Sequence, residues 1–268
     1  MLITIAVAVA ALVLGLLANW LVKRRRQVES GEPIMVSDLV SPMETLAVLL
    51  LAFVLVVAAE SYSTADEAVR SEANIVDNFF EISEFAPPAA AQKLQAATVC
   101  YSRAVLSREW PSMEDGDGMS SAPSAWSTEF RTVFRQLGPE HPLFEILVEA
   151  DRERSNARSE RVMQSVPAIP DVLYWFMLLA LAVTVATFAF SLPARGKKLE
   201  VTTLVVLTAL FTLSLLLIRD VDRPFGGAIS VSADTMRDTE ADITEDFTTL
   251  YGANTLPCDQ NGDRASGA

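Results

Sequence analysis

The sequence lacks most of the residues on which catalytic and nucleic-acid-binding proteins depend. Its 268 residues include one histidine and two cysteines, too few for the usual tetrahedral zinc site. Only 21 residues are basic against 34 acidic ones, and the formal net charge of −13 argues against nucleic-acid binding, which needs clustered Lys and Arg. A glycine-rich phosphate loop, an H-E-x-x-H motif and a nucleophile elbow are all absent. We therefore expect no enzyme and no cofactor.

Hydrophobic residues make up 51% of the chain and are concentrated in four long apolar runs. Backbone polar groups inside lipid must pair within their own segment, so each run is expected to be a helix. The first run reaches about 31 Å at a rise of 1.5 Å per residue, enough to cross a hydrocarbon core of about 30 Å. The sequence predicts an all-α protein with a four-transmembrane-helix bundle in one domain over 1–268, with spans at 2–22, 43–59, 171–192 and 201–218.

The first apolar run has one alternative interpretation, a cleaved signal peptide. Signal peptides carry positive charge before their apolar stretch. Here the order is reversed, because Met1 leads directly into the run and the basic residues 23–26 follow it. We therefore predict that the run is a retained transmembrane helix.

Two basic clusters predict how the spans are oriented. Residues 23–26 follow the first span, and Arg195, Lys197 and Lys198 fill the turn between the third and fourth spans. Positive residues concentrate on the cytoplasmic side, and both clusters lie there together only if the amino terminus is outside. We therefore expect a multi-pass protein of the cell membrane. Its amino terminus, the insert of residues 60–168 and the acidic tail of residues 219–268 are predicted outside.

The insert of residues 60–168 shows helical spacing and no sustained strand alternation, so it predicts an extended extramembrane helical layer between the second and third spans. Its first helix continues the second span without a stop signal, because residues 60–84 contain neither proline nor glycine. Apolar residues with helical periodicity and the prolines between them predict three further helices, at 88–110, 126–137 and 140–166.

Both cysteines lie in segments predicted outside, where disulfides are permitted. Cys100 and Cys258 could pair and tie the tail to the insert; the alternative is two unpaired, small apolar residues. Sequence alone does not place the two within bonding distance. Residues after Pro257 are rich in Gln, Asn, Gly, Asp and Ser, and this composition predicts disorder.

Small residues recur on one face of the first span. Ala11, Gly15 and Asn19 stand at i, i+4 and i+8. Small residues at this spacing let two helices approach closely, and an asparagine can bond across the contact. We predict a helix–helix contact on this face.

Hydroxyl residues occupy the third and fourth spans, where lipid penalises polar groups. They could line a permeation path, or each hydroxyl could simply return a hydrogen bond to the carbonyl four residues earlier. No Asp, Glu, Lys or Arg lies deep inside a span, which argues against a proton-coupled transporter. The pore candidates are Thr184, Thr187, Thr208 and Thr212.

Two short motifs stand out in the segments outside the spans. One reads Glu-Trp-Pro-Ser-Met at residues 109–113, and the other, Asp-Arg-Pro-Phe-Gly-Gly, follows the fourth span at residues 222–227. Physical reasoning alone favours a well-built helix terminus for the second, because proline stops a helix and glycine allows a sharp turn. The motif residues are Trp110, Pro111, Asp222, Arg223, Pro224 and Phe225.

These motifs, and the order of two spans, a helical insert and two further spans, resemble the bestrophin-like domain family of integral membrane proteins. Residues 65–73 are similar to that family's extension of the second helix, and the resemblance covers nearly the whole chain. Gly226 departs from the serine associated with that position in the family.

The resemblance implies a homo-oligomeric channel, because the bestrophins that give the family its name are oligomeric anion channels with the second helix lining the pore. Carried over, the pore wall would run from Thr45 to Glu60. Residues 46–59 would make this wall apolar, which suits a gate that closes by dewetting. Glu60 and the acidic insert would attract cations, so the sign of the permeant ion is left open. The expected partners are the lipid bilayer, further copies of the chain and an ion ligand of unknown identity.

A function from a different class is also compatible with the sequence. The protein could be a non-conducting structural or sensing subunit whose acidic outer helices bind a partner or a divalent cation. The two hypotheses make different predictions for purified protein, because only the first requires an ionic current.

Overall fold

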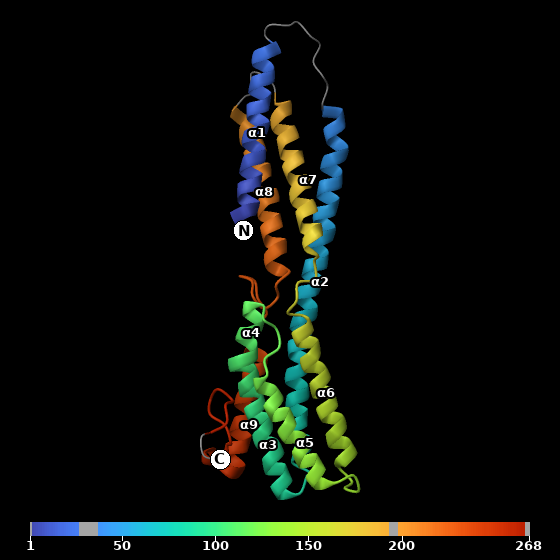
Figure 1. Cartoon of the computed structure of the whole chain (residues 1–268), viewed down its shortest axis with the longest axis vertical. Coiled ribbons are helices and arrows are strands. Elements are labelled where there is room, and N and C mark those ends of the chain that lie inside the picture. Colours follow the sequence, from blue (N-terminus) through green and yellow to red (C-terminus); the bar gives the residue numbers. More distant parts are fainter. Residues whose placement is uncertain (1, 27–36, 193–197, 266–268) are drawn as a thin grey trace. The chain divides into compact units, whose positions relative to one another are not determined.

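The computed structural model describes residues 2–26, 37–192 and 198–265, and these residues form helices joined by short turns, without a named strand (Figure 1). The prediction of an all-α fold is confirmed. The chain divides into two compact units, one of residues 1–60 and 168–222 and one of residues 61–167 and 223–268. The long helix α2 (Ser37–Ser83) contributes to both. The prediction of one domain over residues 1–268 stays a prediction.

The first unit contains the apolar helices. They are α1 (Leu2–Arg26), the first part of α2, α7 (Asp171–Ser191) and α8 (Lys198–Val221). Among the residues that the structure describes, four helical stretches are long and apolar enough to cross a membrane, which agrees with the four predicted spans: Leu2–Val22, Thr45–Ser83, Asp171–Phe190 and Leu199–Val221.

Helix α1 packs against α7 through the small-residue face that the sequence predicts. A Cβ atom added at Gly15 would lie 2.6 Å from the backbone oxygen of Ala186, so only glycine permits this approach. The side-chain amide of Asn19 donates to the backbone oxygens of Ala189 and Leu192, at 3.1 Å each. These two bonds satisfy a polar group inside the apolar unit and fix the pairing of the two helices.

The second unit is a layer of helices around its own apolar core. It contains the last part of α2, whose continuation to Ser83 confirms the prediction of an unbroken helix, and two helices close to their predicted bounds, α5 (Ala122–Leu137) and α6 (Phe144–Met163). Buried aromatic residues such as Phe79, Tyr101 and Phe130 fill its centre. The remaining elements are α3 (Pro88–Ala104), η1 (Val105–Glu109), α4 (Trp110–Asp115), α9 (Asp234–Tyr251) and η2 (Ala253–Thr255).

The helix predicted over residues 88–110 is interrupted by the π-helix η1. The amide of Trp110 donates to the carbonyl of Val105, five residues earlier. Pro111 has no N–H to donate to the carbonyl four residues before it, so a regular α-helical bond cannot form there. The wider π turn accommodates this gap and leaves Glu109 buried.

The prediction of disorder after Pro257 is wrong for residues 258–265. Asp259 binds the backbone of Asp263 through its own amide, at 2.9 Å, and the amide of Ala265 donates to Pro257 at 3.0 Å. Contacts with distant helices hold this segment in place, and amino-acid composition does not reveal such contacts. Residues 266–268 lie outside the described part of the chain.

Candidate functional site

The two sequence motifs meet in the second unit. The rings of Trp110, from α4, and Phe225, from the segment after α8, are packed edge to face with centroids 5.4 Å apart. Both side chains are buried, together with Ala65 and Val69 of α2 and with Val231. The structure therefore joins three segments that lie far apart in the sequence.

Backbone contacts fix the second motif against α4. The carbonyl of Pro224 accepts a hydrogen bond from the amide of Val231 at 2.7 Å, which closes the turn. A Cβ atom on Gly226 would lie 2.5 Å from the backbone oxygen of Glu114, closer than real Cβ contacts allow. Glycine at this position lets the turn lie directly on α4, and a serine would force the two backbones apart.

A buried network of ion pairs connects α2, the π-helix and α6. Arg161 binds both Glu72 and Glu109, the latter at 2.6 Å, and none of the three side chains is exposed. Arg158 donates to Glu109 through its Nε at 3.0 Å. The hydroxyl of Tyr101 donates to Glu72 at 2.5 Å. The two carboxylates and two guanidinium groups balance in charge and hold three elements in register.

Burial and neighbouring charge act against each other on the ionisable groups of this network. Burial alone would raise the pKa of Glu109, but the hydrogen bonds and charges of Arg158 and Arg161 outweigh it and lower that pKa. Burial and the nearby charge of Glu72 raise the pKa of the Tyr101 hydroxyl. Glu109 therefore stays ionised and Tyr101 protonated at neutral pH, which suits a structural network.

Asp222, the first residue of the second motif, belongs to the first unit. Its Oδ1 atom accepts hydrogen bonds from the amides of Ala168 and Ile169, at 3.0 Å each. These amides precede α7, which begins after Pro170, so Asp222 holds the entry to α7 against the end of α8. The remaining motif residues are placed as follows: Arg223 and Pro111 are exposed, and Pro224 is buried.

The four hydroxyl pore candidates do not form one polar lining among the described residues. Thr187, Thr208 and Thr212 each donate to a carbonyl four residues earlier in their own helix, at 2.7–2.8 Å. Thr184 is buried and lines a small apolar cavity between α2, α7 and α8. The remaining two candidates, Thr45 and Glu60, lie on exposed positions of α2.

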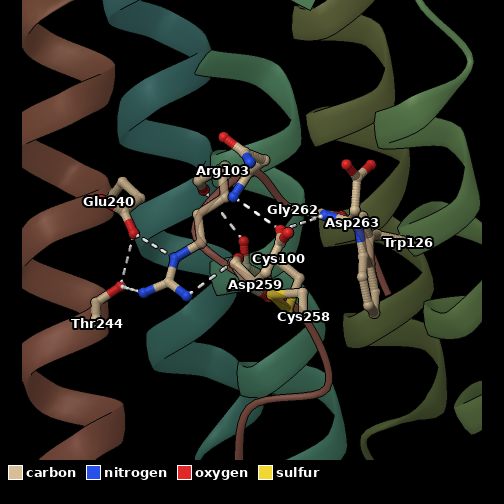
Figure 2. The surroundings of a disulfide bond; sticks show 12 residues. Cys100, Arg103, Trp126, Glu240, Thr244, Cys258, Asp259, Gly262 and Asp263 are labelled. Carbon is tan, nitrogen blue, oxygen red and sulfur yellow. Dashed lines mark hydrogen bonds and ion pairs between the residues drawn. A yellow bond between two sulfur atoms is a disulfide. The ribbon is translucent and has the colours of Figure 1, made fainter. Parts of the chain in front are cut away.

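Cys100 and Cys258, whose pairing the sequence left open, form a disulfide (Figure 2). It joins α3 to the tail across 158 residues of sequence. Beside it, Arg103 donates to Glu240 of α9 at 2.8 Å, and the indole Nε1 of Trp126 donates to the carbonyl of Gly262 at 2.9 Å. The tail is therefore attached to the helical layer by covalent, ionic and hydrogen bonds.

The sequence left open whether the protein binds an ion, and the described part of the chain contains no group of side chains that could hold a metal ion. Among residues 2–26, 37–192 and 198–265, no group of three or more His, Cys, Asp and Glu side chains is arranged to hold a metal ion.

Both a family model and a solved structure match this chain. The model of the Bestrophin-like domain matches residues 5–236. The chain belongs to the Bestrophin-like domain family. The crystal structure of a bacterial bestrophin homologue from Klebsiella pneumoniae, carrying a tyrosine-to-alanine mutation, is similar in fold, with a TM-score of 0.67. The two sequences are 12% identical, and the similarity covers 90% of this chain and 98% of the other. No curated protein matches the chain.

Family membership, together with the four apolar helices, makes this Bestrophin-like protein a multi-pass membrane protein. The sequence analysis identified its two motifs but missed the buried network beside them. A signal was present in α6, because Arg154, Arg158 and Arg161 stand at i, i+4 and i+7 and so share one helix face with Asp151. A face of arginines in a chain of strongly negative charge indicates buried carboxylate partners.

Proposed function

We propose that the protein is a homo-oligomeric, ion-conducting membrane protein in which the membrane part of α2 lines the conduction path. The observation that carries this proposal is an apolar stripe on α2 that no other described part of the chain covers. Family membership supports it, since the resemblance to bestrophins implies an oligomeric channel with this helix along the pore.

The stripe consists of Leu46, Leu49, Phe53 and Val56, and the same spacing continues to Glu60. Its four apolar side chains are 62%, 63%, 67% and 64% exposed. Val48 and Leu55 of α2 are exposed too, at 45% and 37%, so the stripe is the most exposed part of a wider apolar face. Its steps of three and four residues match the spacing along which helices associate with one another. The opposite side of α2 is already used, because Val54 and Ala58 are fully buried within the chain. The stripe is therefore available to lipid or to further copies.

The apolar cavity inside one copy is too small to serve as a conduction path. The cavity between α2, α7 and α8 has a volume of about 20 Å³, room for about one water molecule, and its lining is almost wholly apolar. The hydroxyls of Thr187, Thr208 and Thr212 are engaged by their own helices. Conduction therefore requires several copies, with the path between them.

An apolar wall that ends in a carboxylate has two consequences for the permeant ion. The wall from Leu46 to Val56 offers no ligand for a dehydrated ion, so it acts as a barrier that opens by wetting. A ring of Glu60 carboxylates, one from each copy, contributes negative potential at the end of that wall. Glu60 is thus expected to influence which sign of ion passes.

We further propose that the second unit, the amino terminus and the tail lie outside the cytoplasm. The disulfide between Cys100 and Cys258 supports this orientation, because disulfides persist in oxidising compartments. The basic residues 23–26, with Arg195, Lys197 and Lys198, support the same orientation through their bias to the cytoplasmic side.

Recordings from purified protein in planar bilayers test conduction. We expect discrete currents, and we expect Glu60→Gln to shift the reversal potential measured in a salt gradient. Glu245→Gln removes one exposed carboxylate from α9 and serves as the matched control, without a shift. Intact protein that gives no current above an empty bilayer would overturn the channel proposal and favour the non-conducting subunit.

Cysteine labelling in right-side-out vesicles tests orientation independently of conduction. Glu153→Cys places a thiol on an exposed position of α6, and Lys197→Cys places one between α7 and α8 in the sequence. A membrane-impermeant maleimide should label the first without permeabilisation and the second only after it. The reverse pattern contradicts the proposed orientation.

A further inference from the structure

A cleft of about 250 Å³ lies in the second unit, between α3, α5 and the tail. Its walls come from Lys93 and Ala97 of α3, Trp126 of α5, and Pro257 and Arg264 of the tail. The family model ends at residue 236, so the tail side of the cleft lies outside the part of the chain that the family explains. The cleft therefore combines two walls from the matched domain with one wall that lies outside it.

The tail wall is held by contacts on every side, so the cleft is formed before any ligand arrives. The disulfide of Cys258 lies within it, between Pro257 and Arg264, and the indole of Trp126 donates to Gly262 (Figure 2). A Cβ atom on Gly262 would lie 2.4 Å from the backbone nitrogen of Ala104, which shows how closely the tail follows α3. A pre-formed site binds without the free-energy cost of ordering its own walls.

The cleft has an apolar floor and a rim of net positive charge. Ala96, Ala97 and Trp126 lie beneath the floor and are buried, and the guanidinium of Arg264 lies over the Trp126 ring, 5.1 Å from its centroid. Pro257 is the partly exposed apolar residue of the lining. On the rim, Arg264 is paired with Glu129 at 3.0 Å, which leaves the charge of Lys93 unmatched. Within the described residues Lys93 forms no ion pair. The rim therefore carries two cations and one carboxylate and is positive overall, whereas the whole chain has a net charge of −13.

We propose that this cleft binds a small organic anion with an apolar body, of the class of aromatic or branched-chain carboxylates. The carboxylate would lie between Lys93 and Arg264, and the apolar body would cover Pro257, which is partly exposed. The volume is below the usual range for drug-sized ligands, which restricts the class to small molecules. A bare inorganic anion would leave Pro257 uncovered, and a dianion would be repelled by Glu129.

Benzoate is the probe for this site, because it combines one carboxylate with one planar apolar ring. Its binding to the full-length protein in nanodiscs is measured by calorimetry, with empty nanodiscs subtracted to remove partition into lipid. Benzamide has the same shape without the charge, and acetate has the charge without the ring. We expect saturable binding of benzoate, and binding at least about tenfold weaker for each of the two analogues.

Three variants locate the binding. Lys93→Gln removes the unmatched charge and should weaken benzoate at least about tenfold. Thr255→Trp fills the cleft from an exposed position, where a larger side chain does not disturb the core, and should abolish binding. Arg237→Gln removes an equal charge from the exposed face of α9 and should leave binding unchanged.

The proposal is overturned by any of three results. One is the absence of saturable benzoate binding with a Kd of about 10 mM or tighter. Another is equal affinity for benzamide and benzoate, which would show that the charged rim has no role. The third is a Lys93→Gln protein that binds benzoate as well as the Arg237→Gln control.

Discussion

At the scale of single residues, the account depends most on the buried charges of the second unit. Glu109 is fully buried and is the partner of both Arg158 and Arg161. Removing one partner from a buried pair leaves an uncompensated charge, which costs about 3–5 kcal/mol. An exposed pair, such as Arg152 with Glu149 on the same helix, contributes little in comparison.

We predict that Glu109→Gln destabilises the second unit by about 3–5 kcal/mol, because it leaves two buried guanidinium groups without their shared carboxylate. Pulse proteolysis in a denaturant series measures this loss. Glu153→Gln changes an exposed carboxylate of α6 and should change stability by less than about 0.5 kcal/mol. Equal stabilities of the two variants would contradict a structural role for the network.

A second prediction for Glu109→Gln concerns how its effect on stability depends on pH. The pKa of Glu109 is lowered from its ordinary value of 4.5, so the folded state binds its proton less tightly than the unfolded chain does. The stability that this carboxylate contributes is complete above pH 4.5 and is lost as the pH falls through the lowered value. The stability difference between the wild type and Glu109→Gln should therefore shrink below pH 4.5. A difference that grows on acidification would contradict this sign.

Gly15 provides the corresponding test in the first unit. Gly15→Val would place side-chain atoms where α7 now approaches the helix, and we predict a loss of about 1–3 kcal/mol from overpacking. Ala10→Val adds a similar volume at an exposed position of the same helix and should be neutral. Thermal unfolding in bicelles compares the two, and equal melting temperatures would mean that the α1–α7 contact is not close.

At the scale of elements, the tail is the segment whose structure differs most from the prediction made from the sequence. Residues 258–265 have a composition typical of disorder, yet they are held by a disulfide, the Trp126 indole and the close approach of Gly262 to Ala104. The disulfide closes a loop of 158 residues, and long loops lose the most chain entropy when they are cross-linked.

We predict that Cys258→Ser destabilises the second unit by about 2–5 kcal/mol, because the unfolded chain regains the entropy that the disulfide removes. Wild-type protein in a strong reductant should show the same loss, and the variant should be indifferent to the reductant. Hydrogen exchange would locate the effect in α9 and residues 253–265. A variant as stable as the oxidised wild type would show that the disulfide adds no stability.

The success of the sequence analysis at this scale depended on whether a signal was local. The continuation of α2 to Ser83 and the amphipathic helix α5 could be predicted, because apolar spacing and the absence of Pro and Gly act within a few residues. The π-helix before Pro111 could not be predicted in this way, because the burial of Glu109 depends on Arg158 and Arg161, which lie far away in the sequence. The tail contacts join residues that are more than a hundred positions apart, and composition carries no information about such pairs.

The candidate site also has one part that could be predicted from the sequence and one part that could not. The motif residues could be singled out from the sequence, but the contact between Trp110 and Phe225 could not, because nothing local links the two segments. The hydroxyls of Thr208 and Thr212 were left between two interpretations, and the structure shows each bonded to its own helix. Only the three-dimensional structure shows whether such a hydroxyl lines a permeation path or donates a hydrogen bond within its own helix.

At the scale of the whole molecule, the central claim is that several copies assemble along α2. The stripe of Leu46, Leu49, Phe53 and Val56 is unused within one copy, and the cavity between α2, α7 and α8 has a volume of only about 20 Å³. Assembly would cover the stripe and create a path that a single copy lacks. The channel proposal therefore requires assembly before it requires any particular ion.

The most direct test is the mass of the particle that the protein forms when it is extracted with its native lipids. Native mass spectrometry reads that mass as a multiple of the 29.1 kDa chain. We predict a single closed oligomer of several copies, which Phe53→Asp, by placing a charge on the stripe, converts to smaller species. A wild-type particle of one chain, at concentrations where the protein is folded, would contradict the account.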